Sequence, residues 1–591
     1  MFSTSPVRGY TSGKNEAANG NRLVPPSAIA LLAVAVHGPL LLMQLPAFSA
    51  AAQTQMFLAQ NYASNWSNPW NPHWFGGFSQ TAHAPLTQQV VALLSHAVGI
   101  TAAYMMTQLF VVVLLSLAVY RFAQLWTNAR TACIASVGSI FLGSLGMLIY
   151  REGALPVTAA TALALYGVVF LYGWSREASM LDAIKAVLLL VSAAACDHIT
   201  ALFGVLLFAL PTLYLASRDA SAGDRSSSAT LTRGVVPLAA AAVIAGFILA
   251  PFWVSLFSAP RHLLSTDATP GNFLLNGSLG LQHWLVPMGL LILALPYLFI
   301  SGFAEQRLRP LFIAFYVALI VGLGSTTPIA KIALGRFYQA ATVDTFTFWA
   351  TLLALPLVAH LVSELVYRYG QRAVVGAWLA AVLTFSIPLM WMKYHPVTEN
   401  RFLTDHVSNF LNRDNHGQFR YLTLGFGAQF AEVAGRTSAS TLEGAADLGP
   451  MLPEAAPFGV SHLDEAKQYG SDGMEALRAV LKHANQYGLK FIFVRDRYYE
   501  PLIAFAGWRK VEVYENGNVT LWSKEDVPPA RDLRTQQTLP AIERISWSYL
   551  PFLCLLFALL LMAATPERVA EEEADVALPP TGTGPRMQEA I

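Results

Sequence analysis

Charged residues are scarce in this sequence. Only 12% of its 591 residues are Asp, Glu, Lys or Arg and 54% are hydrophobic, whereas about 25% of an ordinary soluble protein is charged. The net charge of +1 leaves no concentrated Lys/Arg face for a nucleic acid to bind. The composition therefore excludes an ordinary soluble protein, argues against a nucleic-acid partner, and predicts a polytopic helical membrane protein.

Cysteine and the common catalytic fingerprints are also scarce. The three cysteines, Cys133, Cys196 and Cys554, all lie in apolar stretches, so no disulfide framework or cysteine metal site is predicted. The most polar region, 393–545, contains no nucleophile motif, P-loop or dinucleotide fingerprint. His73 and His83 are ten residues apart, which matches no metal-ligand spacing.

Long hydrophobic runs dominate the rest of the chain. A helix needs about 20 mostly apolar residues to cross a bilayer, and by that criterion we predict twelve spans, of which the fifth and ninth are short. They lie at 27–45, 101–122, 131–150, 155–172, 183–196, 199–216, 235–257, 284–300, 311–324, 345–367, 373–392 and 547–564.

The distribution of Lys and Arg predicts the orientation, because short cytoplasmic loops are enriched in them. With a cytoplasmic N-terminus, the short outer loops hold only Arg151, Arg261, Lys331 and Arg336. We expect a cytoplasmic tail (1–26), a transmembrane module (27–392) with outer loops 46–100, 258–283 and 325–344, an outer domain (393–545), a last span (546–564) and a disordered cytoplasmic tail (565–591).

The outer domain reads as a small α/β domain. Alternating patterns predict strands at 419–426, KFIFVR and RKVEVY, and a helical period covers 474–488. ENGN before VTLW predicts a hairpin.

The first outer loop contains an uncharged aromatic stretch. Residues 53–85 include Trp66, Trp70, His73 and Trp74 and have no Asp, Glu, Lys or Arg. Because aromatic rings with polar tips favour the lipid boundary, we expect a loop on the bilayer surface, shaped by its prolines and by Gly76-Gly77. Residues 85–100 then predict a helix along the membrane face.

Ionisable residues at the outer ends of spans are the candidates for chemistry, because charge near lipid is costly unless it is paired or used. The acids are Glu152, Asp197, Asp267 and Asp344; a helix cap or local ion pair is the plainer reading of each. The basic set could hold a lipid phosphate, although long basic side chains often reach the interface without a function. It comprises Arg151, His198, Arg261, His262, Lys331 and Arg336.

The order of these parts resembles a known family. NPWNPHWFGG in the first outer loop, the DHITAL turn, the GSTTP loop and the aromatic FTFW span are similar to the bacterial membrane proteins called 6-pyruvoyl-tetrahydropterin-synthase-related, within the GT-C superfamily of polyprenyl-phosphate-sugar-dependent glycosyltransferases. The resemblance covers about residues 27–400.

The resemblance implies a sugar carried on a lipid phosphate and an acid in the first outer loop, as general base or metal ligand. This sequence instead has Gln53-Thr54-Gln55 there, and a glutamine amide cannot deprotonate a hydroxyl. Either another outer acid has taken the role, or the scaffold binds lipid without glycosyl transfer.

The leading interpretation is a GT-C-like glycosyltransferase of a bacterial inner membrane, using a polyprenyl-phosphate-linked sugar. Glu152, Asp197 or Asp344 would be the base or a metal ligand, and a divalent cation is compatible with such acids. Arg151, His198, Arg261, Lys331 and Arg336 would hold the phosphate, and Trp66, Trp70, His73 and Trp74 would wall the sugar site. The alternatives are a non-catalytic lipid-binding or envelope-assembly protein and, third, a transporter.

Overall fold

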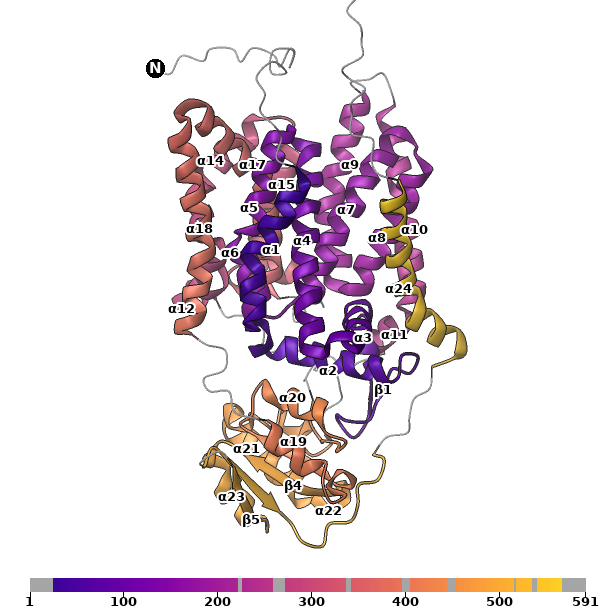
Figure 1. Cartoon of the computed structure of the whole chain (residues 1–591), viewed down its shortest axis with the longest axis vertical. Helices are drawn as coiled ribbons and strands as arrows, with labels where there is room; N and C mark the ends of the chain where they lie inside the picture. Colours follow the sequence, from indigo (N-terminus) through magenta and orange to yellow (C-terminus); the bar gives the residue numbers. More distant parts are fainter. Residues whose placement is uncertain are drawn as a thin grey trace, which may run out of the picture.

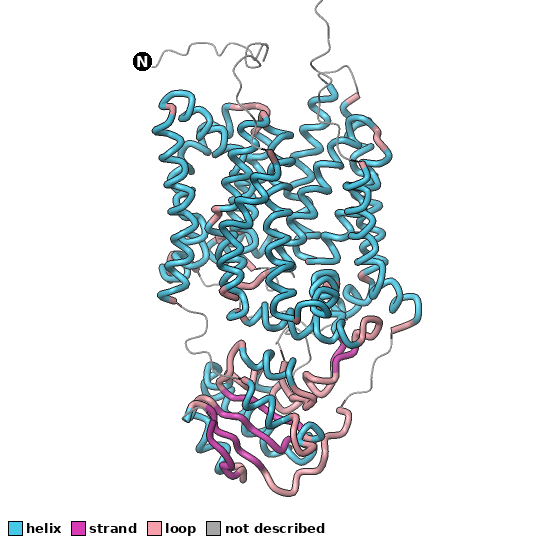
Figure 2. The backbone as a smooth tube through the Cα atoms, viewed as in Figure 1, coloured by secondary structure: helices cyan, strands magenta, loops and turns pink. Residues whose placement is uncertain are grey.

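Helices form a long bundle, and a smaller sheet-containing domain lies at one end of it (Figure 1). The computed structural model describes residues 25–221, 226–258, 272–335, 338, 342–395, 404–444, 452–460, 462–514, 517–533 and 539–565. Strands are confined to the smaller domain apart from one short pair beside the bundle (Figure 2). This smaller domain is the outer domain below.

Each of the twelve predicted spans coincides with helical structure. Nine helices in the described part are long and apolar enough to cross a membrane; the other three predicted spans are the shorter helices α1, α8 and α15. The bundle contains α1 (Pro26–Leu42), α4 (Ile100–Trp126), α5 (Ala129–Ile140), α6 (Gly143–Gly146), α7 (Leu155–Glu177), α8 (Met180–Cys196), α9 (Val205–Ser221), α10 (Ser227–Ile248), α11 (Ala250–Ser258), α12 (Gly277–Gly280), α13 (Val286–Met288), α14 (Leu295–Ala304), α15 (Arg309–Val321), α16 (Pro328–Leu334), α17 (Val343–Tyr369), α18 (Gln371–Tyr394) and α24 (Ala541–Ala564).

Three π-helical turns interrupt these helices within the described residues. They are η3 (Met147–Arg151), η4 (Thr200–Gly204) and η6 (Leu281–Leu285). A π-turn widens the helix by one residue and is frequent at functional sites. Two of the three lie beside acids singled out from the sequence, because Glu152 follows η3 and Asp197 precedes η4.

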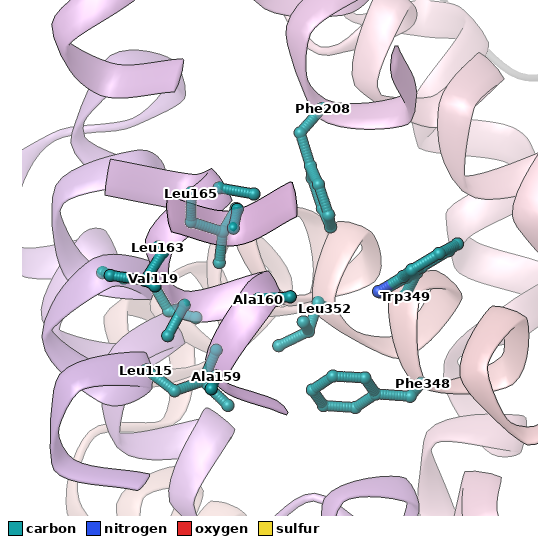
Figure 3. Close-up of a cluster of buried hydrophobic side chains, with 14 of the residues drawn as sticks. Leu115, Val119, Ala159, Ala160, Leu163, Leu165, Phe208, Phe348, Trp349 and Leu352 are labelled. Carbon is teal, nitrogen blue, oxygen red and sulfur yellow. The ribbon is translucent and has the colours of Figure 1, made fainter. Parts of the chain in front are cut away.

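Buried side chains of α4, α7 and α17 meet in one core. Figure 3 shows Leu115 and Val119 of α4, Ala160 of α7 and Phe348 of α17 turned toward one another, and all four are at most 2% exposed. The Trp349 indole of α17 donates to Thr161 Oγ1 of α7 at 3.0 Å. This packing holds in place the start of α7, just after Glu152, and the start of α17, which carries Asp344.

The first outer loop is more helical than the sequence predicts. Its first half forms η1 (Leu45–Phe48) and α2 (Ala50–Ser64), because Ser49 caps α2 by accepting a hydrogen bond from Ala52 N at 3.1 Å. The expectation of a loop from residue 53 is therefore wrong as far as Ser64. Beyond it lie β1 (Trp70–Asn71), β2 (Phe78–Ser79), η2 (Gln80–Ala82) and α3 (Leu86–Val98). The helix α3 is the one predicted over residues 85–100, and its place along the membrane face stays a prediction.

The outer domain is built on a four-stranded sheet in the order β3-β4-β6-β5, with β3 parallel to β4 and the other pairs antiparallel. The strands are β3 (Arg420–Leu424), β4 (Leu489–Val494), β5 (Arg509–Tyr514) and β6 (Val519–Ser523); the helices are α19 (Asp405–Leu411), α20 (Gln429–Arg436), α21 (Gly470–Lys482), α22 (Ala484–Tyr487) and α23 (Glu500–Phe505). The hairpin predicted from ENGN joins β5 to β6, although residues 515 and 516 lie outside the described part.

An aromatic cluster joins the outer domain to the first outer loop. The Trp74 ring has no exposed surface; it stacks on Phe57 of α2 at 3.9 Å between centroids and lies 5.3 Å from Phe430 of α20. Gly444 fits against the same rings, since an added Cβ would come within 2.4 Å of Phe75. These contacts place the outer domain against the loop end of the bundle.

Candidate functional site

The turn between the third and fourth predicted spans carries an Arg–Glu pair. Arg151 ends η3, and its Nε lies 3.4 Å from Glu152 Oε1. Arg151 Nη1 is buried and has no hydrogen-bond partner among the described residues. A buried guanidinium nitrogen without a partner is costly unless an anion or water fills the position, so this nitrogen is a candidate anion donor.

Gly153 sets the close approach of this turn to the first outer loop. It has a φ of +62°, and a Cβ there would meet Ser49 Oγ at 2.1 Å. The Gly153 carbonyl also accepts from the Tyr104 hydroxyl at 2.7 Å. Because only glycine fits this position, Glu152 is held beside the N-terminus of α2.

A histidine–carboxylate pair is the second component. His283 Nδ1 of η6 lies 3.0 and 3.1 Å from the two carboxylate oxygens of Asp344, in the first turn of α17. The two side chains are 15% and 13% exposed. The amide nitrogen of Gln282 lies 3.0 Å from His283 Nε2.

The two pairs form one electrostatic unit. Burial raises the pKa of Glu152 to about 7, and the negative charge of Asp344 adds to this increase, while Arg151 and His283 oppose it. The Glu152 side chain is still 41% exposed. A carboxyl group with a pKa near neutrality can both accept and release a proton under physiological conditions. The cluster of Arg151, Glu152, His283 and Asp344 is called the outer charged cluster below.

The other predicted site residues lie elsewhere or make local contacts. Asp197 Oδ2 accepts from both the backbone N and Oγ1 of Thr200 at 2.7 Å, which is a cap on η4. The His198 ring lies 4.8 Å from Phe252 of α11, and Lys331 is exposed on α16. Arg261, His262, Asp267 and Arg336 are outside the described residues.

The predicted aromatic wall has mainly packing contacts. Trp66 Nε1 donates to the Ser548 carbonyl of α24 at 2.9 Å, and Trp70 packs over Gly77. The His73 carbonyl accepts from Thr441 N of the outer domain at 2.8 Å. Trp74 is fully buried and offers no ring face to a ligand in this conformation.

Sequence reasoning missed His283. It lies in an apolar stretch, LQHWLVP, with no acid nearby in sequence, and its partner Asp344 is 61 residues away. The only local signal is a polar Gln-His pair at the start of a predicted span.

The described part of the chain has no group of three or more His, Cys, Asp or Glu side chains that could hold a metal ion. Carboxylate and imidazole groups are suitable metal ligands in general, but this arrangement does not fit one.

No protein-family model and no curated protein sequence matches the chain. Solved structures do resemble it. Arabinofuranosyltransferase AftD from Mycobacteria matches with a TM-score of 0.55 at 12% identity, over 86% of this chain but 40% of that one. This chain thus spans well under half the length of AftD.

Two further structures match over most of both chains. The Archaeoglobus fulgidus oligosaccharyltransferase has a TM-score of 0.51 at 12% identity, over 85% of this chain and 74% of that one. ArnT from Cupriavidus metallidurans, bound to undecaprenyl phosphate, has a TM-score of 0.50 at 10% identity, over 85% of this chain and 100% of that one. The chain has a GT-C-like fold. At these identities the likeness establishes the fold alone, and activity has to be argued from the site.

Proposed function

We propose that this multi-pass membrane protein is a glycosyltransferase that moves a sugar from a polyprenyl-phosphate donor to an acceptor at the outer face. The observation that carries the proposal is the outer charged cluster, at the loop end of a GT-C-like bundle. The similar structures support it: two are named as sugar transferases, and ArnT is bound to undecaprenyl phosphate.

Arg151 is the proposed phosphate ligand within the described residues. Its Nη1 is buried without a partner, and a guanidinium forms strong charge-assisted hydrogen bonds to phosphate oxygens. The other predicted cations, His198, Arg261, Lys331 and Arg336, complete the proposed phosphate-binding set. Glu152 beside Arg151 limits the excess positive charge when no phosphate is bound.

A carboxylate of the same cluster supplies the base. Transfer requires removal of the acceptor hydroxyl proton as its oxygen attacks the anomeric carbon and the lipid phosphate leaves. Glu152 and Asp344 lie in the cluster, and burial together with the Asp344 charge raises the pKa of Glu152 above the usual carboxyl value. Asp197 remains the third proposed acid, although its observed role is to cap η4.

The remaining assignments complete the proposal. Trp66, Trp70 and His73 lie in the loop between the bundle and the outer domain, where a sugar wall is proposed, and the outer domain engages the acceptor. The membrane is a bacterial inner membrane, with both termini cytoplasmic and the outer domain outside. The narrower relationship to the 6-pyruvoyl-tetrahydropterin-synthase-related proteins remains part of this proposal.

The test is sugar release from a lipid carrier. Purified full-length protein in lipid nanodiscs would be incubated with a panel of radiolabelled undecaprenyl-phosphate monosaccharides and a cell-envelope acceptor fraction. We expect transfer from at least one donor, and a loss of about 100-fold or more in Glu152→Gln and Asp344→Asn, the range for removing a positioned proton-transfer group.

Asp182→Asn, at the other end of the bundle, is the matched control and should retain full activity, while Asp197→Asn shows whether the third acid takes part. Absence of transfer from every donor, or full activity in both cluster variants, would overturn the proposal.

A further inference from the structure

We propose that His283, held by Asp344, is the group that takes the proton from the acceptor hydroxyl, and that Glu152 acts with Arg151 on the phosphate side. This inference rests on the proposed glycosyl transfer, and it assigns to His283 the base role that the proposed function gives to a carboxylate of the cluster.

The contacts of His283 are those of an oriented acid–base group. Asp344 accepts a hydrogen bond from Nδ1 of His283 at 3.0 Å, so Nδ1 carries a proton. Nε2, the other ring nitrogen, points away from Asp344 and lies 3.0 Å from the Gln282 side-chain amide. A ring nitrogen oriented in this way by a third group is the arrangement of a catalytic base.

The Gln282 side chain covers Nε2 of His283 in this structure. Gln282 is the neighbouring residue on turn η6 and is half-buried. An acceptor hydroxyl that donates a hydrogen bond to Nε2 would take the place of this amide.

Rigid elements hold the pair. Asp344 lies in the first turn of α17, which packs on α15 and α5 and whose Trp349 donates a hydrogen bond to Thr161 of α7. Phe273 lies parallel to the imidazole at 6.4 Å between centroids, and the Thr347 hydroxyl donates to the His283 carbonyl at 3.4 Å. Fixed geometry of this kind is what an acid–base group needs.

The Arg151–Glu152 pair suits the opposite side of the reaction. Glu152 is tied to a guanidinium that has a spare buried nitrogen, so an anion bound there lies beside Glu152. A hydroxyl that must lose its proton is better placed beside an uncharged imidazole than beside the anionic donor.

The acceptor O–H gives its proton to His283 Nε2 while its oxygen forms the bond to the anomeric carbon. The bond from that carbon to the phosphate oxygen breaks, and the polyprenyl phosphate leaves with the electron pair. Asp344 stabilises the imidazolium without being protonated, and the imidazolium returns its proton to water.

The test compares turnover with binding of the carrier. In nanodiscs, His283→Gln should lower the turnover of the active donor about 100-fold or more, yet leave the affinity for undecaprenyl phosphate within about twofold. Arg151→Ala should weaken that affinity. The double variant His283→Gln/Asp344→Asn should lose no more than the worse single variant, because residues that act as a unit are not additive.

His360→Gln is the matched control, since His360 lies on the same helix α17 and pairs with Glu305 at 3.9 Å. It should keep wild-type turnover, and thermal unfolding should show that every variant is folded. The acid limb of the rate–pH profile should be present in the wild type and absent from His283→Gln.

Three results would overturn this inference. His283→Gln could keep wild-type turnover, it could lose carrier affinity as Arg151→Ala does, or the two single losses could add in the double variant. An inactive wild type would instead overturn the proposed function itself, so the two failures are distinguishable.

Discussion

At the scale of single residues, the glutamines of the first outer loop serve local structure. The Gln53 amide donates to the Ala47 carbonyl at 2.7 Å, and Gln55 Oε1 accepts from the Gln88 amide at 3.2 Å. Both glutamines are under 10% exposed, where an unpaired carboxylate would be costly. Within the described residues, the charged side chains of the candidate site therefore come from the ends of other spans and not from this loop.

Arg151 carries a prediction of its own. Arg151→Ala should weaken binding of undecaprenyl phosphate about 10-fold or more, because a hydrogen bond to a charged group contributes about 1.5–3 kcal/mol. The measurement is binding of labelled undecaprenyl phosphate to the nanodisc protein.

Arg309→Ala, an exposed arginine bonded to the Phe303 carbonyl, is the control and should bind normally. Equal affinities of Arg151→Ala and the wild type would show that the spare nitrogen has no anionic ligand.

At the scale of elements, the aromatic stretch is the joint between the bundle and the outer domain. Thr441 N donates to the His73 carbonyl at 2.8 Å, and Gly76 N donates to the Thr441 carbonyl at 3.2 Å. With Trp74 stacked between α2 and α20, backbone and rings both link the loop to the domain. The sequence predicts an aromatic loop on the membrane surface, whereas in the structure this stretch forms an interface between the bundle and the outer domain.

Trp74→Ala should loosen this joint. Removing a fully buried tryptophan costs about 3–5 kcal/mol, so we expect faster proteolytic cleavage between the bundle and the outer domain. Limited proteolysis of the full-length protein measures this cleavage rate. The control Phe505→Ala, at a ring that is 81% exposed, should be cleaved at the wild-type rate. A wild-type cleavage rate in Trp74→Ala would show that the joint depends on other contacts.

The end of strand β3 holds a buried acidic pair. Asp464 accepts from Phe426 N at 3.1 Å and Gly427 N at 2.7 Å, and its own N–H donates to Glu443. Burial and the Glu443 charge raise the pKa of Asp464 to about 7. His462 lies 3.4 Å from Glu443; burial lowers the pKa of His462, but Glu443 outweighs it and leaves that pKa raised.

Both shifts predict an outer domain that is more stable in acid than in base. A raised folded pKa contributes stability below the unfolded value, and this is lost as the pH rises through the folded value. The contribution of Asp464 to the free energy of unfolding should therefore fall between about pH 4 and pH 7. The contribution of His462 should fall as the pH rises through its raised pKa. The full-length protein would be heated, and unfolding of the outer domain would be monitored by its susceptibility to proteolysis. The Tm should be lower at pH 8 than at pH 5.5.

Asp464→Asn should flatten this dependence, because the amide cannot ionise. A wild-type Tm that rises from pH 5.5 to pH 8, or an unchanged slope in Asp464→Asn, would contradict the assignment.

At the scale of the whole molecule, α24 runs back along the bundle away from the outer domain (Figure 1). Its end is held there by Lys185 near the start of α8, which donates to the Thr565 carbonyl. Glu152 lies at the opposite end, because Gly153 packs against Ser49 and Ala52 at the start of α2, and α2 packs on α20 of the outer domain.

This arrangement predicts opposite labelling of two exposed positions. Phe505→Cys in the outer domain should react with a membrane-impermeant maleimide on intact spheroplasts. Tyr367→Cys near the end of α17, where the side chain is 91% exposed, should react only after permeabilisation. The native cysteines lie in apolar helices, and the parent protein serves as the blank. The reverse pattern would invert the proposed orientation.

The sequence by itself determined the spans, the separate outer domain and most of its strands, because apolar length and residue periodicity are local properties of the chain. It also indicated Arg151, Glu152 and Asp344, since charge at the end of a span is visible without a fold.

Only the tertiary structure decided the partners. His283 finds Asp344 across 61 residues because η6 packs beside the start of α17, and no local pattern encodes that contact. Trp74 is buried because α20, more than 350 residues later, covers it. Packing between distant segments sets which charges meet and which rings are covered, and side-chain chemistry alone cannot specify it.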